Sequence, residues 1–178
     1  MKKAIYFLFL PFIIVSIVVF ANHKSNSTAK SNPKPLTAAE SKAALKKWES
    51  SPEGVFFKNW EASPAGLKVQ AAAAKINKLA KNHASMEAVV TSLSLPEGAQ
   101  LGFGFMVNIN GEAYILSFGP EMNKEFTELH RLQVNDKILV KTNGVSKAPK
   151  YAYPIVSGDY VERDGKIVYK KTPNKGGC

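Results

Sequence analysis

Cysteine is almost absent from the 178-residue chain, which has only Cys178. A single cysteine excludes an intramolecular disulfide, even in an oxidising compartment. No cysteine stands directly after the hydrophobic run near the N-terminus. Lipid attachment in the manner of bacterial lipoproteins is therefore excluded as well. The Gly176-Gly177-Cys178 ending predicts a flexible tail over residues 172–178.

Signatures of catalysis and of metal binding are missing too. The histidines are scattered over a tether, a helix end and a helix, without the spacing of a metal site: His23, His83 and His130. Three aspartates each stand beside Asn or Gly in expected turns, where turn formation explains them better than acid-base chemistry: Asp136, Asp159 and Asp164. No nucleophile motif or phosphate-binding glycine loop occurs. We therefore expect a protein that is not an enzyme and that has no metal or other cofactor.

Acidic residues are scarce, since 14 Asp and Glu face 24 Lys and Arg, for a net charge of +10. The excess is uneven. Residues 22–85 carry eleven Lys against four Glu, whereas residues 86–178 carry eleven basic and ten acidic residues. The lysine face of the helix expected over Pro64 to Asn82 could attract anionic lipid or another polyanion, and the alternative is an ordinary solvated face. Its lysines are Lys68, Lys75, Lys78 and Lys81.

One long hydrophobic run is present, the eighteen uncharged residues from Ala4 to Ala21. Its length lies between that of a signal-peptide core and that of the shortest membrane-spanning helices, and Val19 and Ala21 could form a cleavage site. Residues 1–21 are therefore either a cleaved signal peptide or a transmembrane anchor. In both cases the lysines at positions 2 and 3 orient the run so that the remainder is exported to the periplasm.

Residues 22–36 are rich in Ser, Asn, Lys and Pro and predict a disordered tether. A helical region is expected over 37–84. Its first helix starts at Thr37, which forms a capping box with Glu40 and should run to about Glu49. The motif Trp-Glu-x-Ser-Pro-x-Gly then occurs twice, at 48–54 and 60–66, and predicts two helix starts with the tryptophans packed at the joints. An amphipathic helix follows from Pro64 to Asn82.

Strand patterns begin at Met86, and residues 85–171 are expected to form a β-barrel. After a turn at Pro96-Glu97-Gly98, the stretch LGFGFMVNINGEAYILSFG contains Asn110-Gly111, a strong hairpin signal. A two-residue loop pairs Val107 with Tyr114, Phe105 with Leu116 and Phe103 with Phe118, and places this bulky face in a core. The opposite face is rich in glycine and permits close approach of another element, for which we expect the segment Ala71 to Ala74.

Pro120 to Leu132 predicts a helix with Met122, Phe126 and Leu129 on one side. In LQVNDKILVKTNGV, the positions of Ile138, Val140 and Thr142 alternate with those of Lys137, Leu139 and Lys141, and Asn135 suits a left-handed turn. GDYVERDGKIVYKK predicts a final strand or a hairpin around Asp164-Gly165. The expected class is α+β, a five- to six-stranded antiparallel barrel preceded by short helices and an N-terminal hydrophobic helix.

The element order strand, strand, strand, helix, strand, strand, with the LQVNDKILVKTNGV strand, resembles exported, anticodon-binding-like OB-fold proteins of bacteria over about half of the chain. This resemblance implies a ligand surface on the second and third strands, helped by the loops that correspond to residues 96–100 and 146–154.

The GFGF sequence is also similar to the aromatic octamer of RNA-recognition motifs. That fold would expose an apolar stripe from Leu101 to Ile109 and would bury Asn108, and it requires a helix where the Asn110-Gly111 hairpin stands. We therefore do not expect this kind of nucleic-acid binding.

One cluster is a candidate ligand site, formed by Lys147, Lys150, Tyr151 and Tyr153 in SKAPKYAYP. Cations and aromatic rings on such a loop could hold an anionic ligand, and the alternative is a loop pinned to the barrel by its tyrosines. Three functions remain open: a non-enzymatic OB-fold binding module of the cell envelope, an assembly component that binds an envelope protein through the helical region, and nucleic-acid binding in an exported context.

Overall fold

The structure, a computed structural model, describes residues 37–120, 126–142 and 144–172. The chain divides into two compact units, Met1–Lys42 and Ala43–Cys178. The expected signal peptide or anchor, the tether and nearly all of the tail lie outside the described residues. Within the described ranges, every helix is too short or too polar to span a bilayer.

The described part of the chain begins with three α-helices, as the sequence predicts: α2 (Ala38–Glu49), α3 (Pro52–Ala62) and α4 (Pro64–Lys81). The capping box is confirmed at the start of α2, where Thr37 N–H donates to Glu40 Oε2 at 2.7 Å and Glu40 N–H donates to Thr37 Oγ1 at 3.3 Å. These two bonds satisfy backbone donors that have no partner within the helix.

The repeated motif forms two corners with the same geometry. In the first, Ser51 N–H donates to the Trp48 carbonyl at 2.9 Å, and the Ser51 hydroxyl accepts from Gly54 N–H at 3.2 Å. The same bonds recur twelve residues later at 2.9 Å and 3.1 Å, among Trp60, Ser63 and Gly66. A Cβ on the glycine of either corner would lie 2.0–2.1 Å from the tryptophan carbonyl oxygen. Both corners therefore require glycine.

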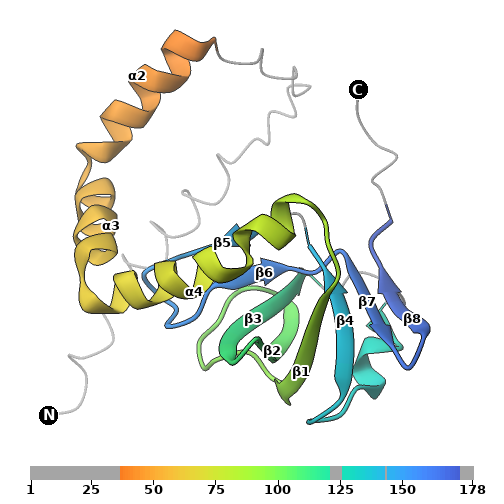
Figure 1. Cartoon of the computed structure of the whole chain (residues 1–178). Helices are drawn as coiled ribbons and strands as arrows, with labels where there is room; N and C mark the ends of the chain where they lie inside the picture. The colour runs from red at the N-terminus through yellow and green to blue at the C-terminus, as the bar shows by residue number, and fades with distance from the viewer. Residues whose placement is uncertain (1–36, 121–125, 143, 173–178) are drawn as a thin grey trace, which may run out of the picture. The chain divides into compact units, whose positions relative to one another are not determined.

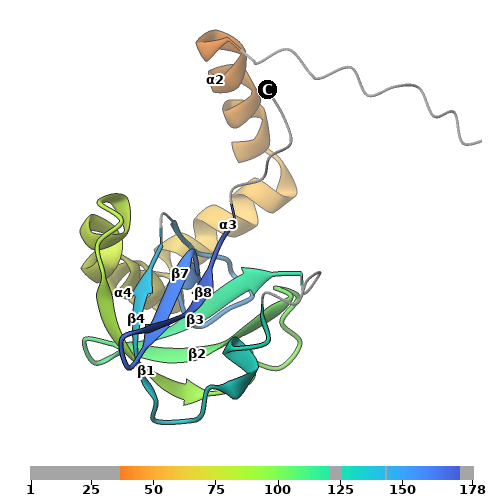
Figure 2. The same ribbon diagram turned by 90° about the vertical axis from the view of Figure 1, so that its right-hand side faces the viewer.

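Eight strands form a single sheet in the order β5-β6-β3-β2-β1-β4-β7-β8. Their bounds are β1 (Met86–Ser92), β2 (Phe103–Ile109), β3 (Glu112–Gly119), β4 (Lys137–Lys141), β5 (Val145–Ser146), β6 (Ile155–Ser157), β7 (Tyr160–Arg163) and β8 (Lys166–Lys170). All pairs are antiparallel except β3 with β6. Figures 1 and 2 show the strong twist of this sheet and α4 lying alongside it.

The α+β class is confirmed, but the eight-stranded, mostly antiparallel sheet is open and does not close into the expected five- to six-stranded antiparallel barrel. The difference arises at Gly158-Asp159, between β6 and β7. Gly158 N–H donates to the Ser117 carbonyl of β3 at 2.8 Å, and Asp159 N–H donates to the Lys141 carbonyl of β4 at 3.0 Å. The chain thus passes from a strand paired with β3 to a strand paired with β4 within two residues. β6 is an additional strand, which lies before the strand or hairpin expected around Asp164-Gly165. The predicted N-terminal hydrophobic helix lies outside the described residues.

The central hairpin is confirmed. Asn110 and Gly111 have φ of 51° and 83°, and the pairs Val107–Tyr114 and Phe105–Leu116 are those expected. The register differs only at the open end, where Phe103 pairs with Gly119 because the register shifts between Phe103 and Gly104. The second predicted hairpin is also present, and so is the left-handed turn at Asn135, with φ of 75°.

The core lies against the bulky face of the hairpin. Its innermost side chains are 2% exposed or less and include Phe105, Val107, Ile109, Tyr114 and Leu116. Helix α4 contributes Ile76 to this core, and the Tyr114 hydroxyl donates to the Ala72 carbonyl at 2.8 Å. The last helix of the helical region therefore shares one core with the sheet.

A second, smaller cluster covers the opposite face of β2 and β3. Ile115 packs there with Tyr151 and Ile155, and Leu95 approaches so closely that a Cβ on Gly104 would lie 3.0 Å from Leu95 Cδ2. Our expectation that Ala71 to Ala74 would fill this glycine-rich strip is wrong. The loop between β1 and β2 fills it, because the buried part of that helical segment packs on the core side with Tyr114.

The predicted helix over Pro120 to Leu132 is wrong in its described part. Residues 126–132 contain turns and the 3-10 helix Leu129–Arg131, and no α-helix. The expected apolar positions are nevertheless buried, with Phe126 and Leu129 at 5% and 2% exposure, while Met122 lies outside the described residues. A short turn suffices because it brings Phe126, Leu129 and Leu132 to the same core.

Candidate functional site

The predicted ligand loop lies between β5 and β6, and its Tyr151 serves the fold. Tyr151 is 8% exposed, packs in the smaller cluster with Ile115 and Ile155, and its hydroxyl accepts from Gln100 N–H at 3.3 Å. The two loops that the OB-fold resemblance assigned to the ligand surface thus meet each other. They meet through packing around Tyr151, which favours the interpretation of a pinned loop.

The other three candidates on this loop have different surroundings. Lys147 Nζ lies 3.4 Å from Glu61 Oε1 at the end of α3. Lys150 Nζ lies 5.9 Å from the centre of the Tyr151 ring, and Tyr153 is 37% exposed. Two of the four residues therefore make contacts that position the loop, and Lys150 and Tyr153 are left as the groups most accessible to a ligand.

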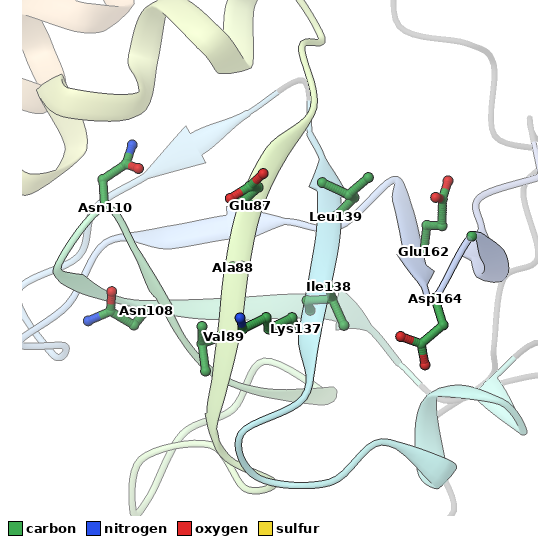
Figure 3. Close-up of a pocket in the computed structure, with 11 residues that line it drawn as sticks. Glu87, Ala88, Val89, Asn108, Asn110, Lys137, Ile138, Leu139, Glu162 and Asp164 are labelled. Atoms are coloured by element: carbon green, nitrogen blue, oxygen red, sulfur yellow. The ribbon is translucent and has the colours of Figure 1, made fainter.

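A hollow of about 590 Å³ lies elsewhere, on the outer face of the sheet above β1 and β4. Figure 3 shows its polar rim, in which asparagines come from the β2 side and carboxylates from β1, β7 and the turn after β7. The side chains of its rim and floor include Glu87, Val89, Asn108, Lys137, Leu139, Glu162 and Asp164.

Strand register explains this arrangement. Every second residue of β1 and β4 faces outward, and Glu87 pairs with Leu139, which pairs with Glu162 of β7. Because neighbouring strands lie about 4.8 Å apart, the backbones of Glu87 and Glu162 are about 10 Å apart with Leu139 between them. The next row contains Asn108, Val89 and Lys137. Two apolar side chains therefore form the floor between charged and amide groups.

The charges at the rim are mostly negative. Glu87 and Lys137 are exposed, and their side chains form no ion pair or hydrogen bond with the residues that the structure describes. Glu162 Oε2 accepts from the Tyr160 hydroxyl at 2.6 Å, a bond that raises the pKa of Tyr160. The Asp164 side chain is 88% exposed and lies 3.8 Å from Arg163 Nε. Three carboxylates thus surround one ammonium group, on a chain whose net charge is +10.

An ion pair next to the hollow joins the start of β4 to the end of β7. Asp136 Oδ2 accepts from Gln133 N–H and from Arg163 Nη1, each at 2.8 Å. The Gln133 bond and the Arg163 guanidinium together lower the pKa of Asp136. These contacts hold the strands that carry Lys137 and Glu162 in a fixed register, so the rim is preorganised.

The chemistry available at the hollow is charge pairing and apolar contact. In the described part of the chain, no three His, Cys, Asp or Glu side chains are grouped so that they could hold a metal ion. A positively charged group could lie among the carboxylates, with its apolar portion on Val89 and Leu139.

Sequence analysis did not identify this hollow. The outward positions of Lys137 and Leu139 followed from the alternation in β4, and Glu87 alternates in the same way in β1. The pairing of β1 with β4, however, joins segments about fifty residues apart, and no local sequence signal specifies it.

In comparisons with known proteins, no protein-family model, no curated protein and no solved structure matches the chain.

Proposed function

We propose that the protein is a non-enzymatic binding module of the bacterial cell envelope, in which the hollow above β1 and β4 receives a positively charged segment of an envelope protein. The observation that carries this proposal is the rim of the hollow, where three carboxylates and one lysine surround an apolar floor. A lysine or arginine side chain pairs its charge with carboxylates and lays its aliphatic stem on apolar surface.

The location rests on the hydrophobic run Ala4 to Ala21, which predicts export. The OB-like nature of the module is supported by strand pairing. β1 lies between β2 and β4 and is antiparallel to both, and β3 pairs in parallel with a strand from the C-terminal part of the chain. OB-folds are partly open barrels, and these strand pairs are compatible with such an architecture.

A nucleic-acid ligand in the hollow is disfavoured by charge. Phosphate groups need neutralisation by lysine or arginine, and here carboxylates outnumber the single Lys137. An anionic ligand on the loop that carries Lys150 and Tyr153 is the competing proposal. The two ligand classes have opposite charge, which makes them separable in one experiment.

That experiment uses fluorescence anisotropy with labelled hexalysine and hexaglutamate peptides and the full-length protein. We expect hexalysine to bind more tightly than hexaglutamate. Glu87→Gln should weaken hexalysine binding about two- to threefold and Lys137→Gln should strengthen it by a similar factor, as expected for one charge at about 7–10 Å near water. Glu97→Gln, at another exposed carboxylate, is the matched control and should have no effect.

Opposite shifts for the two variants cannot come from general destabilisation. Equal binding of the two peptides, or shifts of Glu87→Gln and Lys137→Gln in the same direction, would contradict the proposal. Tight hexaglutamate binding that is lost in Lys150→Gln/Tyr153→Ala would favour the loop instead.

A further inference from the structure

Exposed hydrophobic side chains are concentrated at the front of the chain. The described residues include nine large hydrophobic residues that are exposed, and five of these lie between positions 45 and 67. Their exposed fractions range from 43% to 63%, and they are Leu45, Trp48, Val55, Phe56 and Leu67. Helix α2 buries no side chain and α3 buries only Gly54. We call these five residues the apolar front surface. Within the described chain, no other element buries their side chains.

Aromatic packing fixes part of this surface. The Phe57 ring lies between the two tryptophans, with its centre 5.7 Å from that of Trp48 and 5.6 Å from that of Trp60. Lys58 Nζ also pairs with Glu49 Oε1 at 3.0 Å, which ties α3 to α2. The apolar side chains are thus held by a corner, an ion pair and a row of rings, and they remain exposed despite these contacts.

Lysines accompany the apolar front surface. In α2, Leu45 and Trp48 are three residues apart and share one side of the helix, while Lys42, Lys46 and Lys47 form no ion pair with the residues that the structure describes. Lys46 and Lys47 lie on the other side of α2, whereas Lys42, three residues before Leu45, flanks its apolar side. A helix with tryptophan and leucine on one side and lysine opposite and at the edge has the composition of helices that lie in a membrane interface.

We propose that α2, α3 and the first turn of α4 lie on the surface of an anionic lipid bilayer, with the apolar front surface at the boundary of headgroups and acyl chains and the α2 lysines against lipid phosphates. Lysine near an anionic membrane surface strengthens binding by roughly fivefold per residue. Tryptophan suits this depth because its ring is apolar and its N–H can bond to headgroups or water.

The sequence before α2 favours a bilayer over a protein partner. The hydrophobic run ends at Ala21, and fifteen residues separate it from Thr37. Fifteen residues span at most about 50 Å, and these carry three lysines and no acidic residue. This step rests on the proposed export and anchoring of the chain. If residues 4–21 enter the membrane, the next helices stay within reach of its anionic surface.

Tryptophan fluorescence can report on these helices, because the two tryptophans of the chain, Trp48 and Trp60, both lie in this region. In a Trp60→Phe background, Trp48 is the sole tryptophan. Full-length protein is added to vesicles of phosphatidylcholine alone or with about 30% phosphatidylglycerol, and quenching of Trp48 is measured with acrylamide and with lipids brominated near the headgroup end of the acyl chain. Insertion of the uncharged hydrophobic run is expected to be the same in both kinds of vesicle, so the difference in Trp48 quenching between them reports the helices.

We expect phosphatidylglycerol to lower acrylamide quenching of Trp48 at least threefold and to make the bromolipids effective quenchers. Lys46→Gln/Lys47→Gln should abolish most of this difference, whereas the matched change Lys166→Gln/Lys170→Gln in β8 should not. Leu45→Ser should weaken shielding, while Leu93→Ser, which alters a leucine of similar exposure in the β1–β2 loop, should leave it unchanged.

Equal acrylamide quenching in the two kinds of vesicle would overturn the proposal. Shielding that rises with protein concentration and is independent of phosphatidylglycerol would also overturn it and would indicate that a second copy covers the surface. Hexalysine binding in the hollow is measured on the same protein, so the two proposals can fail separately.

Discussion

Two regions of the molecule differ in what stabilises them. One is the pair of helices α2 and α3, and the other consists of α4 and the sheet. The first pair buries one glycine, whereas the second encloses a core in which many side chains are fully buried. Helices of 11 and 12 residues are marginal in water when isolated. The stability of α2 and α3 therefore depends on their caps, on the two corners and on any partner that covers their apolar side chains. The stability of α4 and the sheet depends on the packing of their shared core.

The largest difference between the two regions should appear when one phenylalanine in each is truncated. Phe105→Ala removes a ring that is 2% exposed and should cost about 3–5 kcal/mol of unfolding free energy. Phe56→Ala removes a ring that is 63% exposed and should change stability by less than about 0.5 kcal/mol in the absence of lipid. Urea unfolding measures both. A similar loss from the two variants would mean that α3 belongs to the core.

The two corners of the same geometry provide a second comparison. An alanine at either corner glycine would clash with a tryptophan carbonyl oxygen, but only one of the two corners leads into the core. Gly66→Ala disturbs the corner that leads into the buried helix α4 and should cost about 1–3 kcal/mol. Gly54→Ala disturbs the corner before α3 and should reduce helical circular dichroism with little change in the melting of the sheet. Equal losses of melting temperature would show that both corners are coupled to the core.

A smaller effect is expected at the contact between α4 and the sheet. Tyr114→Phe removes the hydrogen bond to the Ala72 carbonyl and keeps the ring, so it should cost about 1 kcal/mol. Tyr153→Phe, which alters a tyrosine that is 37% exposed, is the control and should be neutral. The unfolding free energy of each variant in urea tests this, and a neutral Tyr114→Phe would argue against the bond.

The smallest expected effect concerns the dependence of stability on pH. The folded pKa of Asp136 lies below its unfolded value of about 3.9, so the ionised carboxylate stabilises the fold above that value. This contribution is lost as pH falls through the folded pKa. Asp136→Asn should therefore lower stability at neutral pH by less than about 1 kcal/mol, since the side chain is 24% exposed, and the difference from the wild type should vanish near pH ~2. A constant difference between neutral and strongly acidic pH, measured by urea unfolding, would exclude this linkage.

Much of the fold was predictable because it is specified locally. The capping box at Thr37, the Asn110-Gly111 turn and the alternation in β4 each involve neighbouring residues whose backbone preferences agree with the final structure. The predicted helix before β4 was wrong in its described part because Phe126 and Leu129 show helical spacing that a turn also satisfies. The expected barrel of five to six antiparallel strands was wrong because additional strands are present, and one of them, β6, pairs in parallel with β3 through residues about forty positions apart.

The candidate site was predicted less well for the same reason. Tyr151 and Lys147 have the chemistry of ligand-binding residues, and only the structure shows that their partners are Gln100 and Glu61. Glu87 and Glu162 are unremarkable in the sequence because each is an outward residue of its own strand. They become neighbours across Leu139 only after three strands have paired.

The two corners also define a repeated interval in the helical region. Each corner is complete within seven residues, from a tryptophan to a glycine, and the next one starts twelve residues after the first. Between them lies one helix of 11 residues, which is about 16 Å long. A further copy of this interval would add a helix of the same length without altering any bond at the existing corners. The interval therefore sets the distance between neighbouring corners at the length of one helix.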